Sequence, residues 1–184
     1  IDKLPDAVKD VELDEESVNA LQEVVDAIAP DQELIDEYHG WQRYIEDHTP
    51  DAFPGIHRII HRQKEEGGLI CVVSHSCIRN ITRDYKAHFG ILPDAIYGWD
   101  LPEEKRKPST FPLEDIMKKY HLTPDQLLVV DDMKPAYEMA SKAHVSIAFA
   151  GWGRKDHPKI SAQMESLCDF SFYSTEDLER FLYD

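Results

Sequence analysis

Three segments of this sequence end in polar residues that could bind an anion and a cation. Ser74 and the pair Asp131-Asp132 each follow an apolar segment with the character of a buried strand, and Lys107 lies between them in the chain. The carboxyl ends of parallel strands share one edge of a sheet, where ligands bind in α/β folds. A hydroxyl, an ammonium group and two carboxylates at such an edge suit a phosphate group and a divalent cation.

The segments around these residues predict alternating strands and helices from about residue 55 onward. Strands are expected at residues 69–73, 95–97, 127–130, 146–150 and 170–173. Helices are expected at residues 56–66, 77–89, 112–120, 134–143, 158–167 and from 175. Such alternation implies βαβ units, and therefore an α/β fold with a Rossmann-like, doubly wound, mostly parallel sheet.

The first part of the chain has a different pattern. Apolar residues recur at helical spacing in the segments 18–28 and 34–45, and no strand pattern accompanies them. The turn signal Pro54-Gly55 then ends this part. We therefore predict a small helical region at residues 1–53 and an α/β core at residues 54–184.

Composition narrows the class of protein. The 184 residues are 42% hydrophobic and 30% charged, as in ordinary globular proteins. A net charge of −16 argues against nucleic acid as a partner, and no apolar run is long enough to span a membrane. Three cysteines do not make a disulfide framework, so we expect a cytoplasmic protein.

The motifs resemble those of a known superfamily. In order, Val72-Val73-Ser74, Lys107-Pro108 and Val129-Val130-Asp131-Asp132 are similar to motifs II, III and IV of the haloacid dehalogenase superfamily, most of whose members are Mg²⁺-dependent phosphatases. The resemblance extends over nearly the whole chain. It implies a haloacid dehalogenase-like core, with the helical region as a C1-type cap that excludes water and selects the leaving group.

The resemblance also implies a role for each residue. Ser74 and Lys107 are the expected catalytic residues in this chain, and both hold the phosphoryl oxygens of a small phosphorylated metabolite. Asp131 and Asp132 are the expected ligands of Mg²⁺. His75 follows Ser74 directly, and two interpretations stay open for it: contact with the substrate, or simple lining of the edge. Gly151-Trp152-Gly153 is expected to form a tight turn at the same edge.

The first motif of the superfamily, Asp-x-Asp-Gly-Thr, does not occur in the sequence. Residues 1–6 resemble the stretch that follows it. In the superfamily this motif ends a strand that lies between the Ser-motif strand and the Asp-pair strand, and its first Asp is the nucleophile. We therefore expect a core that lacks its first strand, a nucleophile upstream in the functional protein, and a chain that is inert by itself. Direct pairing of the 69–73 and 127–130 strands would contradict this expectation.

Three other classes of protein combine similar residues or share the fold. A haloacid dehalogenase of the same superfamily uses no metal, so the acidic pair favours phosphate chemistry. A response-regulator receiver domain carries its acidic pair first and its Lys last, which is the reverse of the order here. A non-catalytic binding or regulatory protein of the same fold remains open. The sequence does not select among sugar phosphates, phosphoglycolate-like acids and nucleotides, and it does not give the oligomeric state.

Overall fold

The computed structural model describes residues 48–184. The chain divides into two compact units, 1–47 and 48–184. Most of the helical region predicted at residues 1–53 therefore lies outside the described residues. Residues 48–53 form neither helix nor strand.

The strands form two parallel sheets. Their bounds are β1 (Cys71–Val73), β2 (Ala95–Tyr97), β3 (Leu128–Asp131), β4 (Ser146–Ala150) and β5 (Phe170–Phe172). β1 pairs with β2, and β4 pairs with both β3 and β5, always in parallel. The predicted α/β class is confirmed. β1 is shorter than expected, and β3 is shifted by one residue relative to the predicted 127–130, so that Asp131 is its last residue.

Helices connect the strands at the predicted positions. Their bounds are α3 (Ile56–Glu65), α4 (Ile78–Phe89), α5 (Phe111–Tyr120), α6 (Lys134–Lys142), α7 (Pro158–Leu167) and α8 (Thr175–Tyr183). Short 3₁₀ turns lie at η2 (Glu103–Lys105), η3 (Pro124–Gln126) and η4 (Gly151–Gly153). Proline stands in the first turn of α5, α6 and α7, where its missing N–H costs no hydrogen bond.

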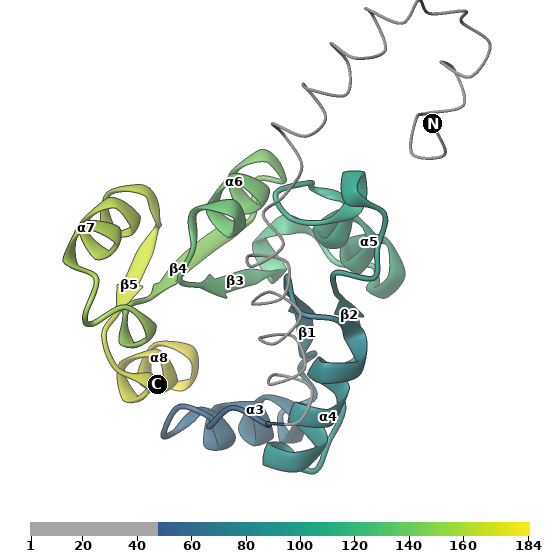
Figure 1. Ribbon diagram of the computed structural model, residues 1–184, viewed down its shortest axis with the longest axis horizontal. Coiled ribbons are helices and arrows are strands. Elements are labelled where there is room, and N and C mark those ends of the chain that lie inside the picture. The colour runs from purple at the N-terminus through teal and green to yellow at the C-terminus, as the bar shows by residue number, and fades with distance from the viewer. Residues whose placement is uncertain (1–47) are drawn as a thin grey trace, which may run out of the picture. The chain divides into compact units, whose positions relative to one another are not determined.

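One apolar cluster spans both sheets. Leu113 and Ile116 of α5 and Met139 of α6 are almost fully buried in it, together with side chains from β1 to β4 such as Val73 and Val129. The buried residues of α3, α4 and α8 lie outside this cluster. Figure 1 accordingly shows α5 and α6 on one side of the strands and α3, α4 and α8 on the other. The two sheets therefore behave as halves of a single layer.

The layer is interrupted between β1 and β3. Within the described residues no ladder joins these strands, so β1 and β3 each keep one edge without a strand partner. Val130 in the middle of β3 is 38% exposed, although Val129 beside it packs into the core cluster. The interruption lies between the two strands that, by the resemblance to the superfamily, are expected to flank a further strand.

Asp94 joins the beginnings of β1 and β2. Its carboxylate accepts hydrogen bonds from Lys64 Nζ at 2.7 and 2.8 Å and from the Ile70 amide at 2.7 Å. Burial acts to raise the pKa of Asp94, but the hydrogen bonds from Lys64 and Ile70 outweigh it and hold the pKa below its ordinary value. Since Ser74 follows β1 directly, this network helps to fix the position of Ser74.

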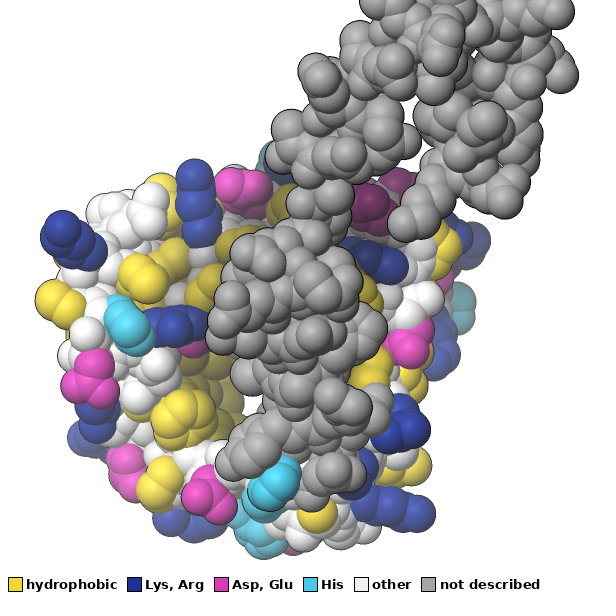
Figure 2. Space-filling view, in the orientation of Figure 1, with side chains coloured by type: hydrophobic (Ala, Val, Ile, Leu, Met, Phe, Trp, Pro, Cys, Tyr) yellow, Lys and Arg dark blue, Asp and Glu magenta, His cyan; other side chains and the backbone are white. Residues whose placement is uncertain are grey.

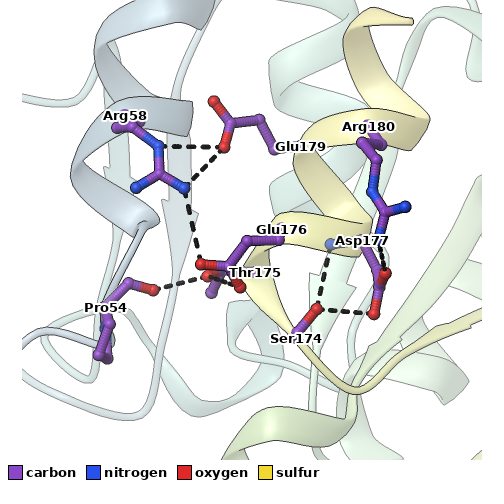
Figure 3. Close-up of polar contacts among 8 residues, drawn as sticks. All are labelled: Pro54, Arg58, Ser174, Thr175, Glu176, Asp177, Glu179 and Arg180. Carbon is purple, nitrogen blue, oxygen red and sulfur yellow. Dashed lines mark hydrogen bonds and ion pairs between the residues drawn. The ribbon is translucent and has the colours of Figure 1, made fainter.

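A second polar network joins α3 to α8 (Figure 3). Thr175 Oγ1 donates a 2.6 Å hydrogen bond to the Pro54 carbonyl, and Arg58 pairs with Glu179 at 3.0 Å. Gly55 has a φ of +87°, and a Cβ there would lie 2.4 Å from Thr175 Oγ1. The Gly in the predicted turn signal is thus required by both its backbone conformation and the close approach of Thr175.

The surface of the described unit carries mixed charge. Figure 2 shows basic and acidic side chains interspersed on the face in view, with apolar side chains between them. None of the helices in residues 48–184 combines the length and the apolar character needed to cross a membrane.

We predict that replacing Asp94 changes the pH dependence of stability. Because the folded pKa lies below the ordinary value of about 3.9, the stabilisation is complete above that pH and is lost as the pH falls through the folded pKa. Asp94→Asn should lower the free energy of unfolding by about 1–3 kcal/mol at pH 6.5, and by much less at pH 3. Urea unfolding at both pH values measures this. Asp156→Asn, at an exposed position, is the matched control; equal losses for Asp94→Asn at both pH values would contradict the prediction.

Candidate active site

Two of the predicted site residues are in direct contact. Lys107 Nζ donates a 2.8 Å hydrogen bond to Asp131 Oδ2 at the carboxyl end of β3. Their side chains are only 10% and 16% exposed, so the interaction is shielded from water and from salt. Charged hydrogen bonds of this length are strong and directional. The contact brings together residues that are 24 positions apart.

The segment that carries Lys107 is held by its neighbours. The His75 ring nitrogen Nε2 lies 3.0 Å from the carbonyl oxygen of Lys107. Because the acceptor is a carbonyl, this nitrogen must carry the proton. Arg106 donates to the Leu101 carbonyl at 2.6 Å and stacks over the exposed Trp99 ring at 4.1 Å. His75 therefore has a contact that neither open interpretation included, since it fixes the backbone of Lys107.

Ser74 lies at the end of β1 and does not cap the following helix. Its Oγ accepts a 3.0 Å hydrogen bond from the Ser76 amide, which closes a turn. The first amide of α4, that of Ile78, instead donates to Asp100 Oδ2 at 2.6 Å. Among the described residues no hydrogen bond joins Ser74 Oγ to Lys107 or to the acidic pair. The end of β1 is instead connected to the segment of Lys107 by the hydrogen bond from His75 to the Lys107 carbonyl.

Each acid of the Asp pair has a cationic partner. Asp131 uses Oδ2 for Lys107 and Oδ1 for the Met133 amide, at 2.9 Å. Asp132 Oδ2 lies 2.7 Å from Nε of Arg154, which follows η4. Sequence reasoning missed Arg154. The available signal was a basic residue directly after Gly151-Trp152-Gly153, a turn that was itself expected at this edge.

The turn η4 is built to lie close to other parts of the chain. A Cβ at Gly151 would lie 2.8 Å from the Tyr173 ring and 3.0 Å from the Phe172 carbonyl, so only glycine fits there. A Cβ at Gly153 would lie 3.4 Å from Asp132 Oδ2. The expected tight turn is confirmed, and it passes directly beside the acidic pair.

The donor atoms of the acidic pair fit the kind of Mg²⁺ site in which substrate phosphate oxygens and water supply the remaining ligands. Within residues 48–184 no cluster of three or more His, Cys, Asp or Glu side chains is placed to bind a metal ion. Mg²⁺ however commonly takes only one or two carboxylates and completes its shell with water and substrate phosphate oxygens. Asp131 and Asp132 supply two hard oxygen donors of this type at one edge of the sheet.

Two thiols near the strands are unsuited to act as nucleophiles. Burial, together with smaller contributions from the charges of Asp169 and Asp131, raises the pKa of Cys168 to about 11. Burial also raises the pKa of Cys71, with a contribution from Asp94. Both thiols are therefore protonated at neutral pH, and the thiolate is the reactive form.

These contacts define a doubly wound α/β protein with a charged site at the carboxyl edge of its strands. A sequence model of haloacid dehalogenase-like hydrolases matches residues 4–150. The chain belongs to the family of haloacid dehalogenase-like hydrolases. Among curated proteins, none matches the sequence.

Solved structures share the fold at low sequence identity. A predicted phosphoglycolate phosphatase from Haemophilus somnus 129PT is 24% identical, with a TM-score of 0.60 over 71% of this chain and 56% of that one. CbbY from Rhodobacter sphaeroides, in complex with phosphate, is 21% identical, with a TM-score of 0.56 over 68% and 55%. A mutant CbbY in complex with xylulose-(1,5)bisphosphate is 18% identical, with a TM-score of 0.59 over 74% and 60%. The chain thus spans little more than half the length of the first two of these proteins.

We predict that Lys107 and Asp131 are energetically coupled. Lys107→Met leaves a shielded carboxylate without its cation and should lower the free energy of unfolding by about 1–3 kcal/mol. Adding Asp131→Asn removes the charge that had been left unpaired, so the double variant should be more stable than the sum of the two single losses implies. Urea unfolding at pH 7 gives all four free energies. Lys159→Met, at an exposed position, controls for the loss of one lysine, and strictly additive losses would refute the coupling.

Proposed function

We propose that this chain carries most of the active site of a Mg²⁺-dependent phosphomonoester hydrolase. The observation that supports this most is the shielded contact between Lys107 and Asp131, beside the interruption between β1 and β3. An ammonium group next to an acidic pair at the carboxyl edge of a sheet suits a phosphoryl group bound with a metal ion.

The attacking group of this proposal is an Asp carboxylate on a strand from outside residues 48–184. This strand would pair with the free edges of β1 and β3, and its carboxyl end would then lie between Ser74 and Asp131. Attack on the phosphorus atom expels the alcohol and forms an aspartyl-phosphate, which water then hydrolyses. Without that carboxylate, the residues described here bind and orient but do not react.

Each residue of this chain has a defined part in the proposal. The hydroxyl of Ser74 and the ammonium group of Lys107 bind phosphoryl oxygens. His75 is a positioning residue, because it holds the backbone carbonyl of Lys107. Asp131 and Asp132 would hold Mg²⁺, which when bound offsets the repulsion between the attacking carboxylate and the phosphate.

We infer a small phosphorylated metabolite as the substrate. The fold neighbours that contain phosphate and xylulose-(1,5)bisphosphate support this class. All three cysteines of the chain are free, which suits the reducing cytoplasm. The residues that would select the leaving group are expected in the helical region before residue 54. The described residues therefore indicate a class of substrate.

Two rival functions make different predictions. A metal-independent dehalogenase would release halide from a 2-haloacid without Mg²⁺. A non-catalytic protein of this fold would bind phosphate or a partner but turn over neither substrate.

The test supplies the missing group. We suggest fusing an apolar strand that ends in Asp-x-Asp-Gly-Thr directly before Ile1 and measuring hydrolysis of p-nitrophenyl phosphate with and without Mg²⁺. The unfused chain should show no turnover. The fused chain should turn over only with Mg²⁺, and Lys107→Ala should lower kcat about 10²- to 10³-fold, as expected for loss of one preorganised electrostatic group.

Matched controls separate the outcomes. Replacing the first Asp of the fused motif by Asn should abolish turnover, and Asp132→Ala should raise the Mg²⁺ concentration needed for half-maximal rate. Lys159→Ala should leave the rate unchanged. Hydrolysis of p-nitrophenyl phosphate without metal would reject the Mg²⁺-dependent mechanism. Halide release from 2-chloropropionate without Mg²⁺ would favour the dehalogenase, and a folded fusion that binds phosphate but is inert would favour the non-catalytic protein.

A further inference from the structure

Arg154 is the cation nearest to the second acid of the pair. Its Nε lies 2.7 Å from Asp132 Oδ2, and its Nη2 lies 2.6 Å from the sulfur of Met133. The side chains of Arg154 and Asp132 are 24% and 32% exposed. The guanidinium group therefore lies against one of the two carboxylates assigned to Mg²⁺.

The backbone fixes Arg154 at this position. Its amide donates to the Gly151 carbonyl at 3.1 Å, and its own carbonyl accepts from the His157 amide at 2.9 Å and from Ser161 Oγ at 3.1 Å. The preceding residue, Gly153, already lies beside Asp132. The proximity of Arg154 to Asp132 therefore follows from the path of the chain and does not depend only on the rotamer of a long side chain.

The contact between Arg154 and Asp132 is close but poorly aligned. Nε of Arg154 is buried, and among the described residues it has no acceptor in hydrogen-bond geometry, even though Asp132 Oδ2 is only 2.7 Å away. The other acid, Asp131, has an aligned hydrogen bond to Lys107 and a more shielded position. Of the two acid–cation pairs, the one at Asp132 is therefore the easier to separate.

The difference between the two acid–cation pairs affects how a divalent cation can enter the site. Two carboxylates and two cations leave the site without net charge, and a divalent cation entering it would be repelled by both resident cations. Separation of the weaker pair frees a carboxylate oxygen and moves one positive charge away. Lys107 can then stay on Asp131.

We propose that Arg154 and the divalent cation compete for the carboxylate of Asp132, so that metal binding displaces the guanidinium group. Arg154 is thus a built-in counter-cation that balances the acidic pair without metal and lowers its affinity for metal. This inference rests on the proposed function only in assigning Mg²⁺ to Asp131 and Asp132.

The test is Mg²⁺ binding by the full chain, measured by isothermal titration calorimetry in 0.15 M salt. Arg154→Gln should lower the dissociation constant for Mg²⁺ roughly two- to fivefold, the range expected for loss of a partly exposed ion pair. Lys155→Gln removes the same charge one residue further along, at an exposed position, and should change the constant by less than half as much. In the Asp132→Asn background, Arg154→Gln should have no effect.

A second readout follows the side chain itself. The ¹⁵N–¹H signal of Arg154 Nε should shift on addition of Mg²⁺ to the natural chain and should not shift in Asp132→Asn. Equal effects of Arg154→Gln and Lys155→Gln, or weaker Mg²⁺ binding by Arg154→Gln, would overturn the inference while leaving the metal site intact. Mg²⁺ binding that is unaffected by Asp132→Asn would instead reject the metal assignment of the proposed function, and this inference with it.

Discussion

The apolar cluster that α5 and α6 form with β1 to β4 is the constraint on which the rest of this structure depends. Its side chains pack against β1 and β2 on one side of the interruption and against β3 and β4 on the other. Backbone hydrogen bonds ordinarily hold neighbouring strands in register, but none joins β1 to β3 within the described residues. Among the described residues, side-chain packing and not a backbone ladder connects the two sheets. Because protein interiors are closely packed and resist deformation, this apolar cluster can keep the carboxyl ends of β1 and β3 on the same side of the molecule.

A second requirement is the neutralisation of Asp131 and Asp132 at the carboxyl end of β3. Two adjacent carboxylates at the end of a strand repel each other and need neutralisation. Here each has its own cation, delivered by a different loop: Lys107 from the segment before α5, and Arg154 from the turn after β4. The loops are in turn held by contacts outside the acidic pair, such as the cation–π stacking of Arg106 on Trp99 and the close approach of Tyr173 to Gly151. The electrostatic balance of the site is thus a product of loop packing.

The sequence was sufficient to predict the order of elements and the residues that end the strands. Hydrophobic periodicity locates elements well, and Ser74 and Asp131 stand where polar residues follow apolar runs, which is a local signal. Lys107 follows the charged segment 103–106, and only the resemblance of Lys107-Pro108 to a family motif indicated it. What it could not predict depends on contacts distant in sequence. The pairing of Arg154 with Asp132 spans two loops, the hydrogen bond from His75 to the Lys107 carbonyl spans 32 positions, and the interruption of the sheet is a property of pairing between strands. The one-residue shift of β3 arises in the same way, since its pairing with β4 begins at Leu128 and includes Asp131, which is in register with Phe149.

These features combine into a site with unequal halves. On the β1 side, the Ser74 hydroxyl accepts from the Ser76 amide and stays near the surface of a turn. On the β3 side, the groups are charged, paired and more enclosed. Under the proposed function, an anion entering between them would meet cations that are already bound to carboxylates, and its affinity would depend on how readily those pairs separate. The aligned, shielded pair at Asp131 resists this, whereas the unaligned pair at Asp132 does not. Two adjacent, chemically identical acids therefore differ in how firmly each is paired with its cation.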